Sequence, residues 1–309
     1  MSKAASSEVD SSIAKATEFL PGRSILVAVR IHRNNQSDKT LPIDLSSLQR
    51  LVVQAATYSD QIAIAYPQSD RLLADALASA FACITANAGS NESSMPLDKK
   101  VDFGVDHAPV AKVALVPVST WGNFIPALNA LLLYAIQGQF THILYQSAEV
   151  NTCASEISAM MSSFDKDTLV VGKAFPGHAF EEGMRRLDGV TVPWNTLAIW
   201  SVPKLQRTGF LMVAEGSQDM EGGVEEVSVI AVLQRLFSPS QEKAVLMSLQ
   251  SDGHSSWNTI WADNGRREWH DKKMRSKVSR AAAHLHQLQL DAFDAVVDHQ
   301  LEGACLIPK

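Results

Sequence analysis

Short apolar runs alternate with longer amphipathic segments over the first half of the chain. The runs are expected to form strands at 24–30, 61–66, 112–116, 142–145 and 168–171, and the amphipathic segments to form helices at 45–57, 70–82, 124–137 and 154–163. This β-α-β-α order predicts an α/β fold with a mixed, mainly parallel sheet flanked by helices. The stretch from Asn87 to His107 is rich in Asn, Ser, Gly and Asp and is expected to be a loop.

The pattern changes after Gly189. Further strands are expected at 193–200 and 209–216, and a largely apolar helix at 223–237 whose apolar side must be buried. A final long helix is expected from about Arg267, with one apolar stripe beside a basic one. The apolar stripe consists of Met274, Val278, Ala281, Leu285 and Leu288, and the basic stripe of His270, Lys273, Lys277, Arg280 and His284.

Composition is that of an ordinary globular protein. Of the 309 residues, 46% are hydrophobic and 19% are charged, and the net charge of −6 gives no global electrostatic case for binding nucleic acid. Cys83, Cys153 and Cys305 lie far apart without a CxxC pair, so reduced thiols are expected rather than disulfides. With no signal-peptide pattern and no apolar run of bilayer length, a soluble, cytoplasmic protein without an integral membrane segment is expected, and a homo-oligomer is compatible with this.

Several common enzyme signatures do not occur in the sequence. It contains no GxGxxG, no GK[ST] phosphate loop, no HExxH and no GxSxG. These absences disfavour a Rossmann dehydrogenase, a P-loop enzyme, a zincin or an α/β-hydrolase. Candidate chemistry must therefore come from dispersed carboxylates, histidines and bases.

A first candidate site follows the apolar run in HILYQSAEV at 142–150. Ligands of open α/β sheets bind beyond the carboxyl ends of the strands. Ser147 and Glu149 stand there, one residue apart, so in an extended segment their side chains point to the same side. A hydroxyl and a carboxylate suit a hard divalent cation. The alternative is that Glu149 caps the helix that begins near Asn151, or is simply solvated.

The segment 123–150 resembles the central signature of the GT-A glycosyltransferases, particularly the inverting family 2. Ala127-Leu128-Asn129 stands at the family's "RN" pair, Ala135-Ile136-Gln137-Gly138 at its "A-x-G" helix end, and Ser147-Ala148-Glu149 at its DxD. The chain departs from the pattern in lacking the arginine and in having serine for the first aspartate. The resemblance implies that Asn129 and Ser147 lie on the donor side and that Glu149 reaches a divalent cation, Mn²⁺ or Mg²⁺.

A second match is GGVEE at 222–226, where the family has a glycine-rich turn and an acidic pair that opens a helix. The resemblance implies that Glu225 or Glu226 is the general base that deprotonates an acceptor hydroxyl. A carboxylate suits this role when burial raises its pKa, whereas a helix N-terminus stabilises its charged form. Acidic residues are in any case favoured in the first turn of a helix, which is the structural alternative.

A third match is WHDKKMRSKVSR at 269–280, since a late histidine often completes the metal shell in the family. His270 resembles that histidine, with Lys272, Lys273 and Arg275 as diphosphate partners. Negative charge that develops on a leaving diphosphate needs such compensation. A solvated basic face of an amphipathic helix is the alternative for each of these lysines.

Further candidates occupy loops between the predicted elements. Arg30 ends the first strand and opens a basic segment at the family's donor loop. His178, Trp194 and Asn195 carry the aromatic and hydrogen-bonding groups that sugar or acceptor sites use, although aromatic residues at such positions are more often core. The second strand ends in Tyr66-Pro67, where the family has an aspartate for the base, so the nucleotide base cannot be named.

The resemblance implies a single GT-A-like domain over 23–309, after a flexible N-terminus at 1–22. Its nucleotide-binding half would be 23–150, its acceptor half 151–266 and its C-terminal helical segment 267–309. The implied activity is metal-assisted, inverting transfer of a sugar from a nucleoside-diphosphate donor to an acceptor hydroxyl. The alternatives are a nucleotidyltransferase, which would normally have a glycine-rich loop where 30–35 has only bases, or a non-catalytic nucleotide- or sugar-binding protein.

Overall fold

The computed structural model describes residues 24–33, 43–85, 111–249, 268, 272 and 274–302. Within these residues, the strands are β1 (Ile25–Arg30), β2 (Gln61–Pro67), β3 (Lys112–Val118), β4 (His142–Gln146), β5 (Thr168–Lys173), β6 (Gly183–Arg186), β7 (Leu197–Ser201), β8 (Lys243–Ser248) and β9 (Val296–Leu301). The helices are α2 (Ser46–Ala55), α3 (Arg71–Thr85), α4 (Ile125–Gln137), α5 (Ala154–Ser162), α6 (Val202–Leu205), the 3₁₀ helix η2 (Met212–Glu215), α7 (Glu225–Phe237) and α9 (Lys277–Gln287).

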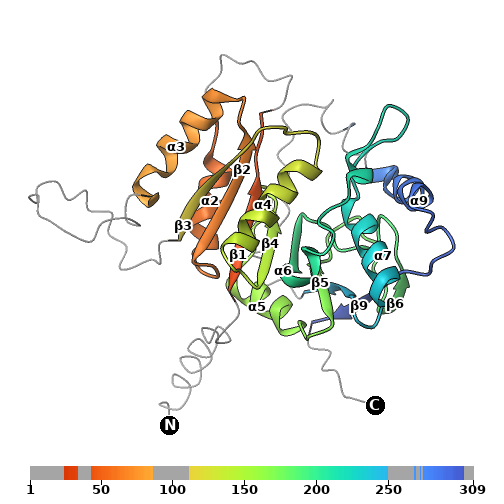
Figure 1. The fold of residues 1–309 in the computed structure, drawn as a ribbon. Coiled ribbons are helices and arrows are strands. Elements are labelled where there is room, and N and C mark those ends of the chain that lie inside the picture. The colour runs from red at the N-terminus through yellow and green to blue at the C-terminus, as the bar shows by residue number, and fades with distance from the viewer. Residues whose placement is uncertain are drawn as a thin grey trace, which may run out of the picture.

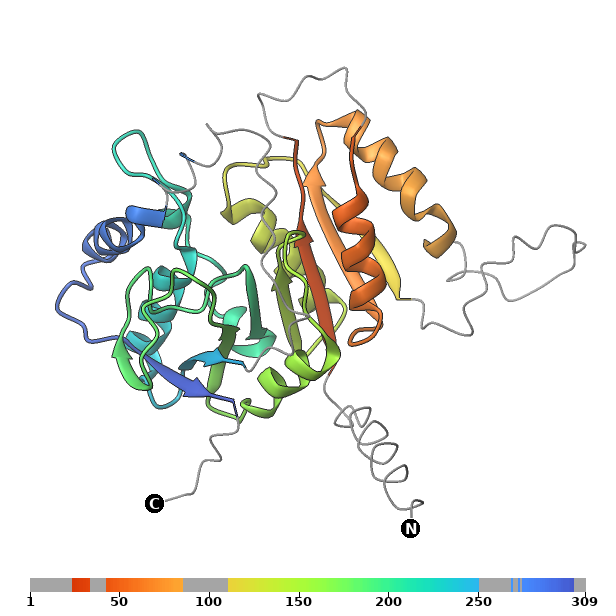
Figure 2. The same ribbon diagram turned by 180° about the vertical axis from the view of Figure 1, so that it is seen from behind.

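The described strands form one nine-stranded sheet in the order β3-β2-β1-β4-β7-β5-β8-β9-β6. β3, β2, β1 and β4 pair in parallel with one another, whereas β7 is antiparallel to both β4 and β5, and β6 is antiparallel to β9. Helix α4 covers one face of the first half of the sheet (Figure 1), and α2 covers the opposite face (Figure 2). The predicted mixed, mainly parallel α/β fold is thereby confirmed.

The early strands and helices occur where the periodicity predicts them, with ends that differ by a few residues. Three short strands escape sequence analysis: β6, β8 and β9. The sequence of β6, GMRR, has no apolar run to mark it. Among the described residues, no helix has both the length and the apolar character needed to cross a membrane.

The predicted strand at 209–216 is wrong, because this segment forms a loop that contains η2. Gly209 and Gly216 have φ of 62° and 87°, values that a strand does not contain. The backbone of Phe210 bonds to Asn129 instead of to a neighbouring strand: its N–H donates to Oδ1 (2.8 Å) and its carbonyl accepts from Nδ2 (2.9 Å). Phe210 and Ala214 of this segment are buried without being paired in the sheet, whereas Met212 is exposed.

Of the predicted apolar stripe, Ala281 is buried and Met274, Leu285 and Leu288 pack against the core, but two residues of the basic stripe are buried as well. α9 packs against α7 and η2, and it buries Arg280, Ala281 and His284, whereas Val278 of the apolar stripe is 47% exposed. Arg280 donates to the carbonyl of Gly222 (2.7 Å), and His284 Nε2 lies 3.1 Å from the carbonyl of Glu221. These hydrogen bonds allow two basic side chains to be buried. The predicted start near Arg267 lies outside the described residues.

The amino end of α4 is capped by a side chain that is distant in sequence. The Glu215 carboxylate accepts hydrogen bonds from the backbone N–H groups of Asn123, Phe124 (2.9 Å) and Ile125 (2.7 Å). These N–H groups have no partner within the helix, and a carboxylate at this end also opposes the helix dipole favourably. The cap therefore ties the loop that carries η2 to the carboxyl side of the sheet.

Candidate active site

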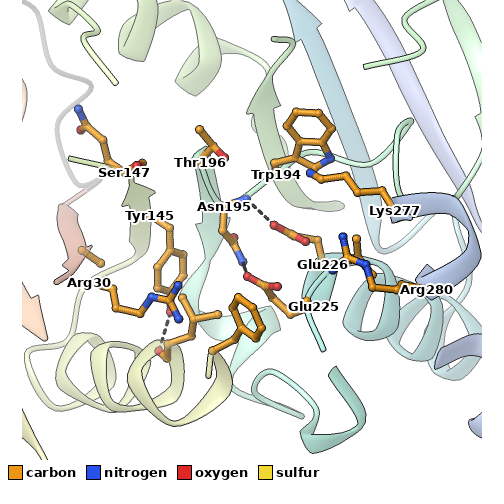
Figure 3. A pocket seen from close by; sticks show the side chains of 16 residues that line it. Arg30, Tyr145, Ser147, Trp194, Asn195, Thr196, Glu225, Glu226, Lys277 and Arg280 are labelled. Carbon is orange, nitrogen blue, oxygen red and sulfur yellow. Dashed lines mark hydrogen bonds between the residues drawn. The ribbon is translucent and has the colours of Figure 1, made fainter. Parts of the chain in front are cut away.

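A cavity of about 240 Å³ lies at the carboxyl ends of β1 and β4, where α7 and α9 begin (Figure 3). Its lining comes from six regions of the chain. The polar side chains are Arg30, Tyr145, Gln146, Ser147, Asn195, Thr196, Glu225, Glu226, Lys277 and Arg280, and Ala28, Phe124, Leu128, Trp194, Gly223 and Val224 complete the wall. Ligands of α/β sheets bind at this edge.

The antiparallel pairing of β7 with β4 places one wall of the cavity. Gln146 lies opposite Leu197 in the register, and the next N–H, of Ser147, donates to the carbonyl of Thr196 (2.9 Å). The segment that precedes β7 therefore lies beside the segment that follows β4. This brings Asn195, from the second half of the chain, to the strand end where Ser147 stands.

The two glutamates open α7 behind a strained turn. Gly223 has φ of 100°, and Val224 adopts the left-handed conformation with φ of 52° and ψ of 42°. A β-branched residue is rarely found there, and such strain concentrates at functional sites. The turn leads directly into Glu225 and Glu226, which are 9% and 4% exposed.

Burial and neighbouring charge set the protonation state of Glu226. Burial, and then the nearby charge of Glu225, raise the pKa of Glu226 to about 8, although Lys277 and the backbone N–H of Asn195 act in the opposite direction. At pH 7 the Glu226 carboxyl therefore holds a proton. A carboxyl of this kind accepts a proton in the pH range where enzymes commonly work.

Three cationic side chains face the same cavity. Arg30 comes from the end of β1, and Lys277 and Arg280 from the first turn of α9. Burial lowers the pKa of Arg30 and of Arg280, but a guanidinium stays charged in proteins. With Glu226 protonated, the cations outnumber the carboxylates in this cavity, which therefore favours an anionic ligand.

The predicted metal site is not completed by the described residues. Ser147 lines the cavity, whereas Glu149 lies in the turn that follows β4 and does not line it. In the part of the chain that the structure describes, no group of three His, Cys, Asp or Glu side chains is placed to hold a metal ion. His270 lies outside the described residues, as does Lys273. The divalent cation stays a prediction.

The other predicted diphosphate partners do not line this cavity. Lys272 is 73% exposed and lies 4.0 Å from Glu221. It lines a second, more open cavity of about 650 Å³, which shares Phe124 and Arg280 with the first. Arg275 is exposed beside it on the helical segment. Asn129 uses its amide to hold Phe210, so its observed contacts are structural.

His178 and Trp194 form a stack at the edge of the site. The ring centroids are 3.6 Å apart, and Lys277 Nζ lies 3.1 Å from the ring centroid of Trp194, so the faces of this buried indole are occupied within the protein. His178 Nδ1 accepts from the N–H of Phe175 (2.9 Å), and its Nε2 lies 3.1 Å from the carbonyl of Val192. Burial, with Lys277 nearby, lowers the pKa of His178 to about 3. The ring is therefore neutral and fixes the surrounding loop.

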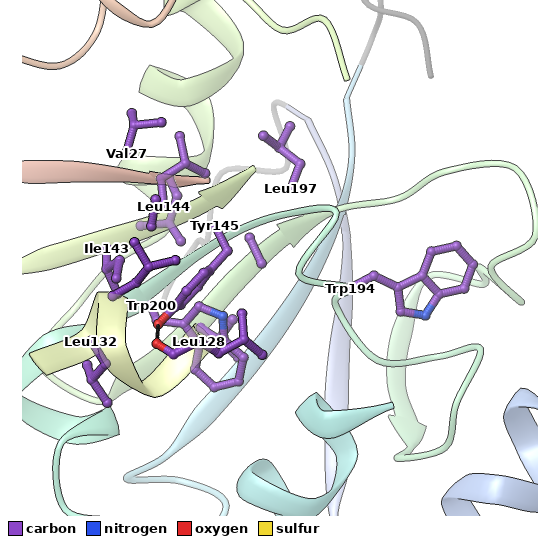
Figure 4. Packing of buried hydrophobic residues seen from close by; sticks show 14 of the residues in the cluster. Val27, Leu128, Leu132, Ile143, Leu144, Tyr145, Trp194, Leu197 and Trp200 are labelled. Atoms are coloured by element: carbon purple, nitrogen blue, oxygen red, sulfur yellow. Dashed lines mark hydrogen bonds between the residues drawn. The ribbon is translucent and has the colours of Figure 1, made fainter. Parts of the chain in front are cut away.

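The cavity lining includes three residues that were not predicted as site residues: Tyr145, Lys277 and Arg280. Lys277 and Arg280 belong to the predicted basic stripe, and their spacing of one helical turn was the available signal. Tyr145 had none, because it reads as one more apolar position of β4. In the structure its hydroxyl donates to the carbonyl of Leu128 (2.9 Å), and both residues lie in the core shown in Figure 4. Its ring packs edge-on against Phe210.

Solved structures resemble this chain in fold at low sequence identity. No protein-family model matches the chain, and no curated protein matches its sequence. A cytidylyltransferase from Leptospira borgpetersenii aligns with a TM-score of 0.32 and 11% identity over 60% of this chain and 62% of that one, which is less than two thirds of its length. The 4-diphosphocytidyl-2C-methyl-D-erythritol synthase of Anaerococcus prevotii aligns with a TM-score of 0.45 and 10% identity over 82% of this chain and 97% of that one. Likeness at this level concerns the path of the chain and not what it binds.

Gly223 offers a test of the strained turn. A Cβ atom there would lie 2.5 Å from Nη1 of Arg280, in a backbone conformation that disfavours side chains. We expect Gly223→Ala to lower the free energy of unfolding by about 2–3 kcal/mol, measured by urea denaturation. The matched control is Gly183→Ala, since Gly183 has φ of 97° but no atom within 4 Å of its added Cβ. Equal losses in the two variants would show that contact with Arg280 does not constrain the turn.

The raised pKa of Glu226 predicts a pH-dependent effect of Glu226→Gln on stability. Between the ordinary pKa of 4.5 and about 8, the folded protein holds a proton that the unfolded chain releases, so the wild type loses stability as pH rises through this window. Glutamine imitates the protonated carboxyl and removes this loss. Relative to the wild type, the free energy of unfolding of the variant should increase by at most about 1.4 kcal/mol per pH unit up to pH 8, measured by urea denaturation at several pH values. The exposed Glu182→Gln serves as control, and parallel curves for Glu226→Gln and wild type would contradict the raised pKa.

Proposed function

We propose that the protein is a glycosyltransferase that moves a sugar from a nucleoside-diphosphate donor to an acceptor hydroxyl. The observation that carries the proposal is a buried carboxyl with a pKa of about 8 in the same cavity as three cationic side chains. A proton acceptor and an anion-binding group are the two things that this transfer needs.

The proton acceptor in this proposal is Glu226. Its carboxylate takes the proton of the acceptor hydroxyl while that oxygen bonds to the anomeric carbon of the donor sugar. The bond from the anomeric carbon to the diphosphate oxygen breaks at the same time, and the nucleoside diphosphate leaves with the electron pair. General-base assistance of this kind contributes about 10²–10⁴ to the rate.

In the proposal, the cations stabilise the negative charge of the leaving diphosphate. Arg30, Lys277 and Arg280 surround the cavity from β1 and α9, and stabilising the charge that develops in a transition state commonly contributes more to catalysis than any other effect. The 240 Å³ cavity is smaller than the roughly 300–1,000 Å³ of typical ligand sites, but the 650 Å³ cavity adjoins it at Phe124 and Arg280. Together they offer space for a sugar and for a second, larger moiety.

Nucleotidyl transfer is the second candidate for this arrangement of cations. When the attacking group is a phosphate, it is already ionised at neutral pH, and a buried base with a raised pKa has no proton to remove. The buried Glu226 therefore favours a hydroxyl acceptor. The loop after β1 also lacks the glycines that would bring backbone N–H groups close to a triphosphate.

Ligand binding and product analysis distinguish the two activities. We expect nucleoside diphosphates, from a panel that includes UDP and GDP with and without Mn²⁺ or Mg²⁺, to raise the melting temperature by specific binding to the folded state. With nucleotide-sugar donors, glycosyl transfer or slow hydrolysis should release a nucleoside diphosphate. Release of pyrophosphate from nucleoside triphosphates and sugar phosphates would instead establish nucleotidyl transfer. If no nucleotide raises the melting temperature under any metal condition, both activities are overturned.

Turnover of Glu226→Gln tests the proposed base directly. We expect kcat to fall by about 10²–10⁴ with little change in donor binding, because glutamine keeps the shape of the side chain but accepts no proton. In the wild type, kcat/KM should rise with pH and level off near pH 8, where Glu226 becomes ionised. Glu182→Gln should keep wild-type turnover, since this side chain is exposed and does not line the cavity. Full activity of Glu226→Gln would remove the base from the proposal.

A further inference from the structure

Asn195 contacts the two glutamates through different groups. Its backbone N–H donates to Oε1 of Glu226 (2.5 Å), and its side-chain Nδ2 donates to Oε1 of Glu225 (3.2 Å), as Figure 3 shows. One residue therefore holds both members of the acidic pair. Because the two hydrogen bonds come from the main chain and from the side chain, a substitution at this position can remove one and leave the other.

Trp200 determines which way the Asn195 amide faces. Its indole Nε1–H donates to Oδ1 of Asn195 (2.8 Å). An indole N–H is only a donor, so the amide oxygen must point toward it and the NH₂ group toward Glu225. Trp200 is fully buried in β7 and packs edge-on against Phe210, with ring centroids 5.3 Å apart. Its position, and with it the orientation of the amide, is thereby set by the core.

We propose that Asn195, oriented by Trp200, is a positioning residue that assigns different roles to the paired glutamates, with Glu225 as the partner that accepts the side-chain hydrogen bond and Glu226 as the proton-exchanging one. This inference rests on the proposed function for its catalytic meaning. Its structural part is that one asparagine gives the two carboxyls different hydrogen-bond partners, and this part can be tested without any substrate.

The physical basis is the competition between two adjacent buried carboxyls, each of which accepts one hydrogen bond from Asn195. Two adjacent buried carboxyls cannot both ionise readily, so a small bias decides which of them keeps the proton. The Nδ2 hydrogen bond stabilises the charged form of Glu225, and the charge of Glu225 in turn raises the pKa of Glu226. Other titratable or charged groups around the pair are Arg30 of β1, Tyr145 of β4, and Lys277, Arg280 and His284 of α9, together with Glu215 and Glu221 of the loop before α7. These groups are unchanged by a substitution of Asn195.

Asn195→Ala isolates the contribution of the side chain. It removes the hydrogen bond to Glu225 and keeps the backbone N–H to Glu226. The negative charge on Glu225 then loses a hydrogen-bond donor, and this charge is one cause of the raised pKa of Glu226. We expect the titration midpoint of the buried carboxyl to fall by about one pH unit. The measurement is an infrared titration of the protonated carboxyl stretch, with Glu226→Gln used to assign the band.

Trp200→Phe provides a second variant that touches neither glutamate. It keeps an aromatic ring against Phe210 but removes the indole N–H, so the Asn195 amide can turn over. The midpoint should move in the same direction as in Asn195→Ala, by a smaller amount. In both variants, we expect kcat to fall about tenfold with KM nearly unchanged, if the donor is turned over as proposed.

Asn129→Ala is the matched control for a merely structural effect. The Asn129 amide also makes two hydrogen bonds to hold a loop, but to Phe210 and not to the glutamates. The Asn129→Ala substitution should lower the melting temperature and leave the carboxyl titration unchanged. If Asn195→Ala and Trp200→Phe behave in the same way, the inference is overturned. A shifted titration in a protein that turns over no donor would keep this inference and overturn the proposed function.

Discussion

Strand β7 pairs in the antiparallel sense with β4 on one side and with β5 on the other, and this double pairing joins the two halves of the sheet. Because its direction is reversed, the segment before β7 arrives at the same edge at which β1 and β4 end. Asn195 is thereby delivered beside Ser147. The cavity, the orientation of the acidic pair and the contact between the halves all depend on this register.

The site also depends on the burial of two acidic side chains whose charge the neighbouring groups compensate only in part. Glu225 and Glu226 begin α7 behind Val224, whose left-handed conformation is unfavourable for a β-branched residue. The sheet, α9 and the capped end of α4 enclose this turn, so the packing around it offsets the cost of both the strain and the burial. The result is a carboxyl that exchanges its proton near pH 8 rather than near 4.5.

Much of the fold could be predicted, because periodicity reports which side of an element is buried. The runs that became β1, β2, β3, β4 and β5 alternate with amphipathic helices, and this order is enough to predict a mainly parallel sheet. The segment at 209–216 is equally apolar but forms a loop, in which Phe210 and Ala214 are buried and the backbone of Phe210 bonds to Asn129 of α4. Sequence periodicity does not distinguish these two ways of burying apolar residues.

The chemical types in the site were determined by the sequence alone: an acidic pair behind glycines, a strand that ends in polar residues, and a basic stripe on the last helix. Only the tertiary structure decided which of these residues meet. It brought Arg280 and Lys277 to the glutamates, left Glu149 outside the cavity lining, and committed Asn129 to holding a loop. The physical reason is that a sequence specifies local conformation through nearby residues, whereas the pKa of a carboxyl and the partners of an amide depend on segments that only long-range packing brings together.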